Sequence, residues 1–436
     1  MDYDLVIIGA GWAGFNATLK AKALGLKAAL IEKGQIGGTC LNRGCIPTKA
    51  LIHSAKIYRL VKKASSFGIE IKDAPVINFL KIQERKDALI KQLSAGMQFM
   101  LKGIDFFKSP AEIVSNHEIK TADGILKAKF IMIASGSRPM ELPSLKFDGR
   151  KILSSDDLLN IKNVPRSILI IGAGVIGCEF AGLFNALGSE VSMAEKMPQV
   201  LPGIDKEIAR KLENIFKKSG IKITTNCDAL ALDLNAYELV LLCVGRVSQS
   251  ENLGLEKLGI ASEKGKVLVD QYLKTNIPNI YAAGDCTGGV MLAHYAAYQG
   301  ELAADNIAHP DSQRGMGEVA VPSCIFTYPE IATVGLSEEQ ASSKGLKIKI
   351  HKFDFLGSGL ARIMAETDGF IKIISDDSST QVLGASIIGP SACELIGILT
   401  LAVSNRLTLS QIQKTIFAHP TLSESIAGSL KDSHAA

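Results

Sequence analysis

Residues 3–14 read YDLVIIGAGWAG, and this stretch decides the first part of the fold. The apolar, partly β-branched run 3–8 predicts a strand, and a helical stretch (15–24) and a second strand (28–31) follow it. Between the first strand and the helix stand three glycines at GxGxxG spacing: Gly9, Gly11 and Gly14. The first such glycine makes a tight turn, the second lets the backbone approach a pyrophosphate, and the third allows close helix packing. The stretch therefore predicts a dinucleotide-binding strand–turn–helix unit.

The same pattern recurs in residues 167–177, SILIIGAGVIG. A strand (167–171) again leads into a glycine loop, which is followed by a helix to Leu187 and a strand that ends at Glu195. The loop residues that we expect to contact a dinucleotide are Gly172, Gly174, Val175, Ile176 and Gly177. A single glycine motif is weak evidence, because glycine turns are common in α/β proteins. Two copies in the same context predict two dinucleotide-binding folds.

An acidic residue stands at the same offset in both copies. Glu32 follows Gly9 by 23 residues. Glu195 follows Gly172 by 23 residues as well. At this offset a carboxylate accepts hydrogen bonds from the adenosine ribose. Glu195 would bind the 2′-hydroxyl of NAD and repel the 2′-phosphate of NADP, and no arginine cluster stands nearby. We therefore predict NAD at the second fold; the alternative is that Glu195 merely ends a strand.

Residues 37–49, GGTCLNRGCIPTK, contain Cys40 and Cys45, the closest pair among the eight cysteines. Four intervening residues at an irregular, glycine-containing helix start allow the two sulfurs to reach bonding distance. A helix N-terminus and nearby cations lower a thiol pKa, which gives a reactive thiolate. The alternative, a zinc site, needs four ligands, and no second cysteine or histidine pair stands nearby. The stretch predicts a redox-active pair, and we expect no metal site.

The other six cysteines are scattered singly, most of them in apolar segments. We interpret five of them as small buried hydrophobic residues: Cys178, Cys227, Cys243, Cys324 and Cys393. Cys286 directly follows Asp285, and we interpret it as a packing residue without redox chemistry.

The segment 37–49 resembles the redox-active signature of the pyridine nucleotide-disulfide oxidoreductase family, and the resemblance extends over essentially the whole chain. It implies that Cys40 is the outer sulfur, which exchanges with the substrate, and that Cys45 lies against a flavin. It also implies that Lys49 lies near the flavin N5 and pairs with Glu179. Glu179 stands inside an otherwise apolar helix, where a carboxylate needs a partner because burying it alone is costly.

Two further segments resemble the family's flavin-binding halves: residues 129–139, and residues 275–285, TNIPNIYAAGD. The resemblance implies that Asp285 binds the ribityl chain of FAD and that a helix opening at residues 291–294 faces the flavin. Ser135 stands where the family usually has threonine, which retains the hydroxyl group. The implied FAD-binding residues are Gly9, Gly11, Gly14, Glu32, Lys33, Gly38, Thr39, Lys49, Ala111, Ser135, Gly136, Asp285, Met291, Leu292, Ala293 and His294. The implied NAD-binding residues are those of the second glycine loop together with Glu195 and Gly245.

Near the end of the chain, residues 417–424 read FAHPTLSE and resemble the family's terminal motif. The resemblance implies that His419 is the catalytic acid–base and that Glu424 orients its ring and stabilises the imidazolium. In this family the histidine reaches the redox pair of the other subunit. A homodimer with two shared active sites is therefore expected.

The expected fold class is α/β: two Rossmann-like dinucleotide-binding domains, for FAD and NAD, and an α+β C-terminal dimerisation domain. We expect an FAD-binding domain at 1–149 and 264–318, an NAD-binding domain at 150–263 and an interface domain at 319–436. In the NAD-binding domain only one strand (221–225) and a short segment precede the run 237–245. Relatives usually insert an antiparallel meander there, so this domain is expected to be shortened.

Composition excludes several classes of function. The 48 Lys and Arg against 44 Asp and Glu give a net charge of only +4, which carries no signal for nucleic acid or for a membrane surface. The most apolar stretch, 167–188, contains glycines and Glu179 and fits strand, turn and helix better than a membrane span. The chain enters a strand almost at once, so we expect no targeting segment and a cytoplasmic location.

The resemblance implies oxidation of dihydrolipoyl groups by NAD⁺, through the cysteine pair and FAD. The lipoyl group would arrive on a protein of a 2-oxoacid dehydrogenase or glycine cleavage complex. One alternative is another NAD(P)H-dependent disulfide reductase or a mercuric reductase on the same scaffold. Another is a non-catalytic regulator that senses flavin or NAD, which the intact Cys40, Cys45, His419 and Glu424 argue against.

Overall fold

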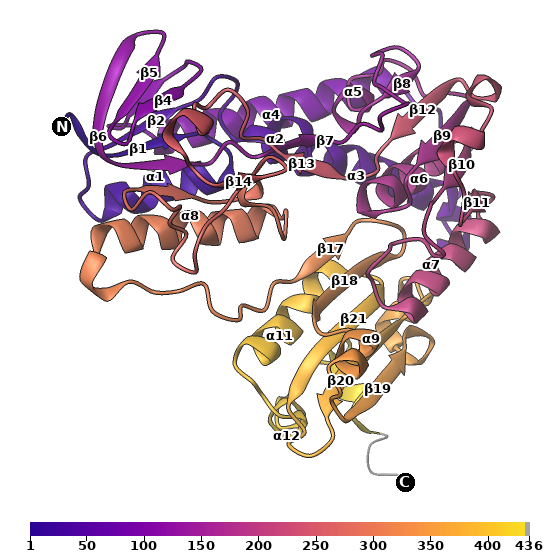
Figure 1. Ribbon diagram of the computed structural model, residues 1–436. Helices are drawn as coiled ribbons and strands as arrows, with labels where there is room; N and C mark the ends of the chain where they lie inside the picture. Colours follow the sequence, from indigo (N-terminus) through magenta and orange to yellow (C-terminus); the bar gives the residue numbers. More distant parts are fainter. Residues whose placement is uncertain (432–436) are drawn as a thin grey trace.

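The computed structural model describes residues 1–431, which fold around three β-sheets (Figure 1). The first sheet has seven strands in the order β3-β2-β1-β6-β5-β4, with β16 paired to the second half of β6. Strands β3, β2, β1, β6 and β16 run parallel, as dinucleotide-binding folds require. The bounds are β1 (Tyr3–Ile8), β2 (Ala28–Ile31), β3 (Asp105–Phe107), β4 (Glu112–Ser115), β5 (Glu118–Thr121), β6 (Gly124–Ile133) and β16 (Ile280–Ala282).

Two helices, α1 (Trp12–Ala23) and α8 (Ala293–Ala308), pack together below this sheet in Figure 1. Their close approach depends on one glycine, because a Cβ at Gly300 would lie 2.1 Å from the carbonyl oxygen of Ala13. Residues 293–308 therefore join the first fold although they lie far from it in the sequence.

The second sheet is entirely parallel, in the order β11-β10-β9-β12-β8. Its strands are β8 (Ile152–Leu153), β9 (Ser167–Ile171), β10 (Glu190–Ala194), β11 (Lys222–Thr224) and β12 (Leu239–Leu242). Its helices are α5 (Ser155–Leu158), α6 (Val175–Leu187) and α7 (Lys206–Lys218). Between β11 and β12 the described chain forms two 3₁₀ turns, Ala229–Ala231 and Leu234–Ala236, and no strand. The second fold therefore lacks a strand insertion at this point.

The third sheet is antiparallel, in the order β17-β18-β21-β20-β19, and α11 packs across it. Its strands are β17 (Ser323–Ile325), β18 (Glu330–Gly335), β19 (Ile348–Asp354), β20 (Phe370–Asp376) and β21 (Val382–Gly389). Its helices are α9 (Glu338–Ser343), α10 (Gly359–Ile363), α11 (Ala392–Ser404), α12 (Leu409–Gln413) and α13 (Glu424–Gly428). This is the expected α+β domain.

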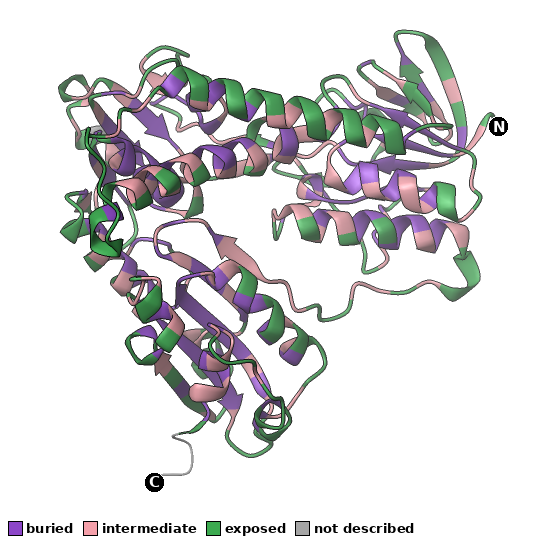
Figure 2. Cartoon of the chain, turned by 180° about the vertical axis from the view of Figure 1, so that it is seen from behind, coloured by how far each residue is buried: buried purple, intermediate pink, exposed green. Residues whose placement is uncertain are grey.

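Three helices connect the sheets: α2 (Gly38–Arg43), α3 (Cys45–Lys62) and α4 (Phe79–Met100). Helix α3 contributes Leu51 and Ala55 to a core that also contains Phe180 and Phe184 of α6 and Ile388 of the third sheet. It is thus fixed between the second and third sheets. Helix α4, in contrast, is mostly exposed or half-buried along its length (Figure 2). Two short ladders complete the fold, β7 (Ser137–Pro139) with β13 (Arg246–Ser248) and β14 (Ser262–Glu263) with β15 (Lys266–Val267).

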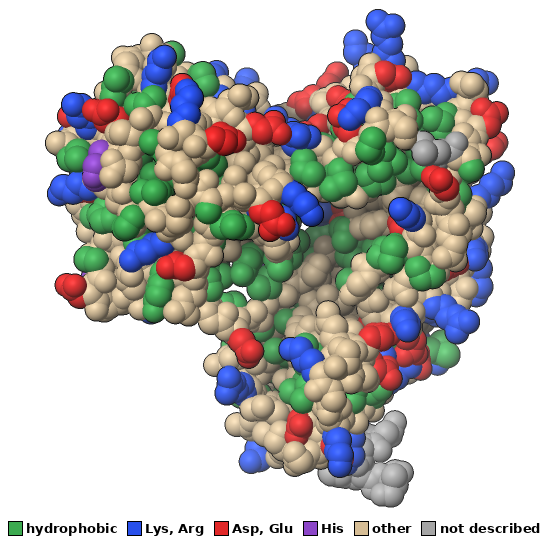
Figure 3. Space-filling view, viewed as in Figure 1, with side chains coloured by type: hydrophobic (Ala, Val, Ile, Leu, Met, Phe, Trp, Pro, Cys, Tyr) green, Lys and Arg blue, Asp and Glu red, His purple; other side chains and the backbone are tan. Residues whose placement is uncertain are grey.

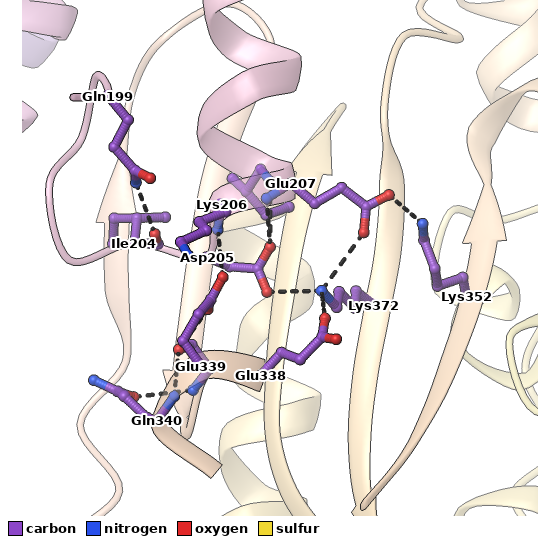
Figure 4. Close-up of polar contacts among 12 residues, drawn as sticks. Gln199, Ile204, Asp205, Lys206, Glu207, Glu338, Glu339, Gln340, Lys352 and Lys372 are labelled. Carbon is purple, nitrogen blue, oxygen red and sulfur yellow. Dashed lines mark hydrogen bonds and ion pairs between the residues drawn. The ribbon is translucent and has the colours of Figure 1, made fainter. Parts of the chain in front are cut away.

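A buried ion cluster holds the second fold against the third sheet (Figure 4). Nζ of Lys372, in β20, lies 2.8 Å from Oδ2 of Asp205 and 2.5 Å from Oε2 of Glu338. Asp205 also caps α7, because its Oδ1 accepts hydrogen bonds from the backbone N–H groups of Glu207 and Ile208. The cluster therefore ties a helix start of one domain to a strand and a helix of another. No helix within residues 1–431 is long and apolar enough to cross a membrane.

Candidate active site

Cys40 and Cys45 lie on either side of a break between two helices. Helix α2 ends at Arg43, Gly44 leaves helical geometry with φ −144° and ψ −114°, and α3 begins at Cys45. A Cβ at Gly44 would lie 2.9 Å from the carbonyl oxygen of Thr39, so the break needs glycine. Cys40 therefore lies in the short helix before the break, and Cys45 is the first residue of the helix after it. Their side chains form a hydrogen bond.

The pKa values of the two thiols are shifted in opposite directions. The hydrogen bond from Cys40 lowers the pKa of Cys45 to about 7, burial opposes this shift, and the charge of Lys49 adds to it. The same hydrogen bond, together with burial, raises the pKa of Cys40. Near pH 7 Cys45 is therefore partly ionised, whereas Cys40 stays a thiol, so the thiolate of the reduced pair forms on Cys45. Both cysteines are in the reduced form here.

Lys49, one turn along α3 from Cys45, forms an ion pair with Glu179 of α6. Its Nζ lies 2.8 Å from each carboxylate oxygen of Glu179, whose side chain is only 3% exposed. Glu179 also accepts a hydrogen bond of 3.0 Å from the backbone N–H of Phe326, and the Lys49 ammonium lies 4.9 Å from the Phe326 ring centre. The predicted pair is thus present, and it joins three segments beside the cysteines. The sequence pattern gave no sign of Phe326.

The first glycine loop has the shape of a pyrophosphate cradle. A Cβ at Gly9 would lie 2.3 Å from the carbonyl oxygen of Ala134, and a Cβ at Gly14 would lie 1.8 Å from that of Gly9. Gly11 has open space on its side-chain face, where a ligand can approach the backbone. Helix α1 follows directly, without a side chain capping its first N–H groups. These features fit a bound dinucleotide phosphate.

The second glycine loop repeats this geometry position by position. A Cβ at Gly172 would lie 2.5 Å from the carbonyl oxygen of Cys243, and one at Gly177 would lie 2.0 Å from that of Gly172. Gly174 again faces open space, and α6 again starts without a side-chain cap. The two folds are therefore equivalent at their loops. Val175 and Ile176 form the first turn of α6, as expected.

The two glutamates at the common offset also lie alike. Oε2 of Glu32 accepts a hydrogen bond of 2.8 Å from the N–H of Ala10, and Oε1 accepts one of 2.6 Å from Gly34. In the second fold, Oε2 of Glu195 accepts one of 2.6 Å from Ala173, and Oε1 accepts one of 2.8 Å from Met197. Each carboxylate fixes its own glycine loop, in addition to any contact with a ribose. Glu195 therefore does more than end a strand.

Asp285 lies at the centre of a hydrogen-bond network that the sequence pattern did not predict. Its Oδ2 accepts a hydrogen bond of 2.5 Å from Oγ of Ser137, and its carbonyl oxygen accepts one of 2.6 Å from Oγ of Ser248. Arg246 donates from Nε to Oγ of Ser137 over 2.8 Å. In the sequence, the only sign of Ser137, Arg246 and Ser248 was their position close to Gly136 and Gly245, which were predicted to bind the cofactors. The network leaves one oxygen of the half-buried Asp285, Oδ1, available for a ligand hydroxyl.

The remaining predicted FAD-binding residues surround the same region. Gly38 has a positive φ of 55°, and a Cβ there would lie 2.8 Å from Cα of Gly11, so the cysteine segment packs on the first glycine loop. Oγ of Ser135 donates to the carbonyl oxygen of Gln249, and Gly136 turns the chain with φ 76°. The others lie at segment ends: Lys33 after β2, Thr39 in the first turn of α2 and Ala111 before β4. Gly245, which was predicted to bind NAD, lies between β12 and β13.

Residues Met291 and Leu292 precede α8, which begins at Ala293 without a side-chain cap. A helix start without a cap offers free backbone N–H groups to a ligand acceptor. His294 is exposed, and its Nε2 lies 2.8 Å from the carbonyl oxygen of Pro322 in the linker to the third sheet. Figure 3 shows a hollow above the third sheet where hydrophobic side chains gather.

His419 and Glu424 form the predicted pair, at the start of α13. Nδ1 of His419 lies 2.9 Å from Oε2 of Glu424, whose Oε1 accepts a hydrogen bond of 3.2 Å from the N–H of Thr421. The hydrogen bond with His419 lowers the pKa of Glu424, which stays a carboxylate. The imidazole is 77% exposed, and within residues 1–431 no hydrogen bond or ion pair joins it to Cys40 or Cys45.

Of the five cysteines interpreted as small buried hydrophobic residues, only one is fully buried. Cys178 is buried, whereas Cys227, Cys243, Cys324 and Cys393 are half-buried. Cys324 and Cys393 are also not single, because their side chains form a hydrogen bond. The prediction failed because the two residues lie far apart in the sequence and meet only in the fold. Cys286 is buried as predicted, with its thiol against the carbonyl oxygen of Ala283. Within the described residues no group of three or more His, Cys, Asp or Glu side chains is arranged to hold a metal ion.

Known proteins share this architecture along the whole chain. The family described as "Pyridine nucleotide-disulphide oxidoreductase" matches residues 3–300, and its dimerisation domain matches residues 321–429. Dihydrolipoyl dehydrogenase of Chlamydia muridarum is 43% identical over 444 aligned residues, which cover 97% of this chain and 95% of that protein. The enzyme of the same name from Bacillus subtilis is 36% identical over 463 residues, covering 98% and 96%.

Solved structures agree with the fold. LpdA from Mycobacterium tuberculosis superimposes with a TM-score of 0.90 at 28% identity, covering 98% of both chains. The HOCl-induced flavoprotein disulfide reductase RclA from Escherichia coli superimposes with a TM-score of 0.87 at 30% identity, covering 98% of this chain and 99% of that one. The predicted resemblance and fold class are confirmed: the chain belongs to the pyridine nucleotide-disulfide oxidoreductase family.

Proposed function

We propose that the protein is an FAD-dependent enzyme that oxidises dihydrolipoyl groups with NAD⁺ through the Cys40–Cys45 pair. The observation that carries the proposal is the thiolate–thiol pair beside the Lys49–Glu179 ion pair, packed on the first of two dinucleotide-binding folds. Relatives that are 35–43% identical over nearly the whole chain are named dihydrolipoyl dehydrogenase, which supports this substrate over other disulfides.

The residues of the site suit thiol–disulfide exchange. His419 of the partner subunit takes the proton of a substrate thiol, and the resulting thiolate attacks the disulfide at Cys40. The second substrate thiol then displaces Cys40, which closes the lipoyl disulfide and leaves the cysteines reduced. Cys45 is the thiolate that remains, because its pKa is the lower one. FAD, held by the first glycine loop, Glu32 and Asp285, would supply a two-electron acceptor beside Cys45, and NAD⁺, held by the second glycine loop and Glu195, would be the final acceptor. Lys49 holds a positive charge beside Cys45 throughout.

The C-terminal domain supports a homodimer with shared active sites. The exposed His419–Glu424 pair has no partner for its free ring edge within the described part of its own chain. Apolar side chains that a second subunit would cover are exposed in the same domain, Leu401 at 62% and Ile416 at 97%. In this proposal the lipoyl group is carried by a protein of a 2-oxoacid dehydrogenase or glycine cleavage complex. We place the enzyme in the cytoplasm, because most of its eight cysteines are spread singly along the sequence and do not form a disulfide framework.

The proposed roles follow the domain limits expected from the sequence. Residues 1–149 and 264–318 bind FAD, 150–263 bind NAD, and 319–436 form the interface. The shortened connection between β11 and β12 runs beside Glu195, because the N–H of Cys227 donates to the Glu195 carbonyl oxygen over 2.9 Å. The two hydrogen bonds of the Glu195 carboxylate are present all the same.

A direct assay tests the proposal. The FAD-loaded protein is mixed with dihydrolipoamide and NAD⁺, and NADH formation is followed, with NADP⁺ as the comparison coenzyme. We expect turnover with NAD⁺ that Cys45→Ser abolishes while FAD stays bound. Absence of turnover with either coenzyme would refute the proposal. Reduction of glutathione disulfide or another disulfide by NADH or NADPH, without turnover of dihydrolipoamide, would favour the second candidate, a reductase of other disulfides that resembles RclA.

A further inference from the structure

The third sheet contains a second pair of thiols that plays no part in the proposed reaction. Cys324 lies in β17 and Cys393 at the start of α11, 69 residues apart in sequence. Sγ of Cys324 lies 3.8 Å from the carbonyl oxygen of Cys393, and Sγ of Cys393 lies 3.8 Å from that of Ile331. Cys324 pairs with Ala332 of β18 across the β-ladder, and Ala332 is the neighbour of Ile331, so both cysteines lie beside the same part of β18. The two side chains form a hydrogen bond.

As in the Cys40–Cys45 pair, the pKa of one thiol is lowered and that of the other is raised. The hydrogen bond from Cys393 lowers the pKa of Cys324, and the same bond raises the pKa of Cys393. Burial and the carboxylates of Glu330 and Glu394 oppose ionisation of Cys324, and the Lys49 ammonium favours it. Cys324 is therefore the thiol that attacks an oxidant, and Cys393 is the thiol that resolves the product.

The pair also lies next to the catalytic centre. Two residues after Cys324, the backbone N–H of Phe326 donates to the buried carboxylate of Glu179, and the Phe326 ring contacts Lys49. At the other end, the N–H of Cys393 donates to Oε2 of Glu330 over 3.3 Å. A cavity of about 220 Å³, lined by Lys49 and Glu330 among others, opens between these segments. Neither cysteine lines this cavity, but their chain neighbours Phe326 and Ser391 do.

We propose that Cys324 and Cys393 are a second, oxidisable dithiol, which a peroxide converts to a disulfide that joins β17 to α11. The Cys324 thiolate attacks one oxygen of hydrogen peroxide, which forms a sulfenic acid and releases hydroxide. The Cys393 thiol then attacks the sulfenic sulfur, forms the S–S bond and releases water. Two electrons pass from the two sulfurs to the peroxide, and the hydroxide takes up a proton to give a second water. Half-buried sulfurs in contact can close in this way with little movement of the backbone.

The test uses the FAD-loaded dimer. The protein is fully reduced, freed of reductant, exposed to a small excess of hydrogen peroxide, alkylated with N-ethylmaleimide and digested without reductant for mass spectrometry. We expect two linked peptides, Cys40–Cys45 and Cys324–Cys393, and dithiothreitol should open both. Absence of the Cys324–Cys393 link, at a peroxide dose that closes Cys40–Cys45 completely, would overturn the inference.

Two variants assign the roles, and both leave the proposed catalytic residues untouched. In Cys393→Ser the resolving thiol is missing, so Cys324 should accumulate as a sulfenic acid that dimedone traps. In Cys324→Ser the hydrogen bond that raises the pKa of Cys393 most is lost, but burial and the carboxylate of Glu330 still raise it, so we expect Cys393 to remain a free thiol under the same dose. Equal dimedone labelling of Cys324 in wild type and Cys393→Ser would contradict a resolving role. These readouts do not depend on dihydrolipoamide oxidation, so they remain valid if the proposed function fails.

Discussion

Nζ of Lys49 lies equidistant, at 2.8 Å, from both carboxylate oxygens of Glu179. The carboxylate is buried at 3% exposure and the lysine is 27% exposed. Glu179 has one further donor, the N–H of Phe326. The ion pair therefore links α3, which begins with Cys45, to α6, which begins at the second glycine loop. Its two partners belong to segments that would bind different dinucleotides.

Removing the lysine should destabilise this junction. In Lys49→Met the buried Glu179 retains only one hydrogen bond, and breaking a buried pair costs about 3–5 kcal/mol. Because Lys49 is partly exposed, we expect a loss of about 1–3 kcal/mol in the free energy of unfolding, measured with urea. Lys56→Met on the same helix is the matched control, since its Nζ lies 3.9 Å from Glu330 and both are partly exposed. Equal losses in the two variants would contradict a special role for the Lys49 pair.

After the hydrogen bond from Cys40, the charge of Lys49 should also help to lower the pH at which Cys45 ionises. With its pKa lowered to about 7, Cys45 is a thiol below that pH and a thiolate above it. In the reduced enzyme, labelling of Cys45 by iodoacetamide should therefore rise with pH and reach half its maximum near pH 7, while Cys40 reacts only at higher pH. Mass spectrometry of the labelled peptides measures both. Lys49→Met should move the midpoint for Cys45 upward, and Lys49→Arg should preserve it. Faster labelling of Cys40 at neutral pH would reverse the assignment.

Glu195 should decide between NAD⁺ and NADP⁺, and Glu32 offers a matched control in the first fold. Both carboxylates accept two backbone hydrogen bonds in the same arrangement. Glu195→Gln removes the charge that repels a 2′-phosphate. We expect the ratio of kcat/KM for NAD⁺ to that for NADP⁺ to fall by roughly 10- to 100-fold. Glu32→Gln should weaken FAD retention and leave this ratio unchanged. If Glu195→Gln lowers the free energy of unfolding but leaves this ratio unchanged, the carboxylate only anchors the glycine loop and does not select the coenzyme.

Local patterns in the sequence predicted local structure well. The strands expected at 3–8, 28–31 and 167–171 have those bounds in the structure. Each is a short apolar run that is followed directly by a glycine or a charged residue. The first helix begins at Trp12, three residues before the predicted start at Phe15. Gly14 caused the difference, since glycine disfavours helices in general but is required here by the contact with Gly9.

The spacing of residues in the sequence could not predict contacts between distant segments. The sequence alone predicted Lys49 and Glu179 as a pair only through family resemblance, because 130 residues separate them. Nothing in the sequence joined Cys324 to Cys393, or Asp205 to Lys372, which lie 167 residues apart. Such pairs form where sheets and helices of different domains meet, and the periodicity of either segment carries no information about its partner.

Lys372 should be among the most sensitive positions for stability. It is 2% exposed, and in Lys372→Met the buried Asp205 loses its ionic partner. We expect the free energy of unfolding to fall by about 3–5 kcal/mol, as for other broken buried pairs. Lys211→Met, which removes an exposed pair with Asp368 between the same two domains, should cost less than about 1 kcal/mol. Urea unfolding of both variants measures the difference, and similar losses would show that the cluster adds nothing beyond a surface ion pair.

A mixed dimer can decide whether the active site is shared between subunits. In a heterodimer of Cys45→Ser and His419→Gln chains, purified through two different affinity tags, shared sites leave one site with both defects. The other site has an intact cysteine pair from one chain and an intact histidine from its partner. We therefore expect about half of the wild-type rate of dihydrolipoamide oxidation, although each parent homodimer is nearly inactive. If each chain instead used its own His419, every site in the heterodimer would carry one defect and the activity would stay at the level of the parents. The exposed imidazole, which is 77% accessible and turned to Glu424 on one side only, favours the first outcome.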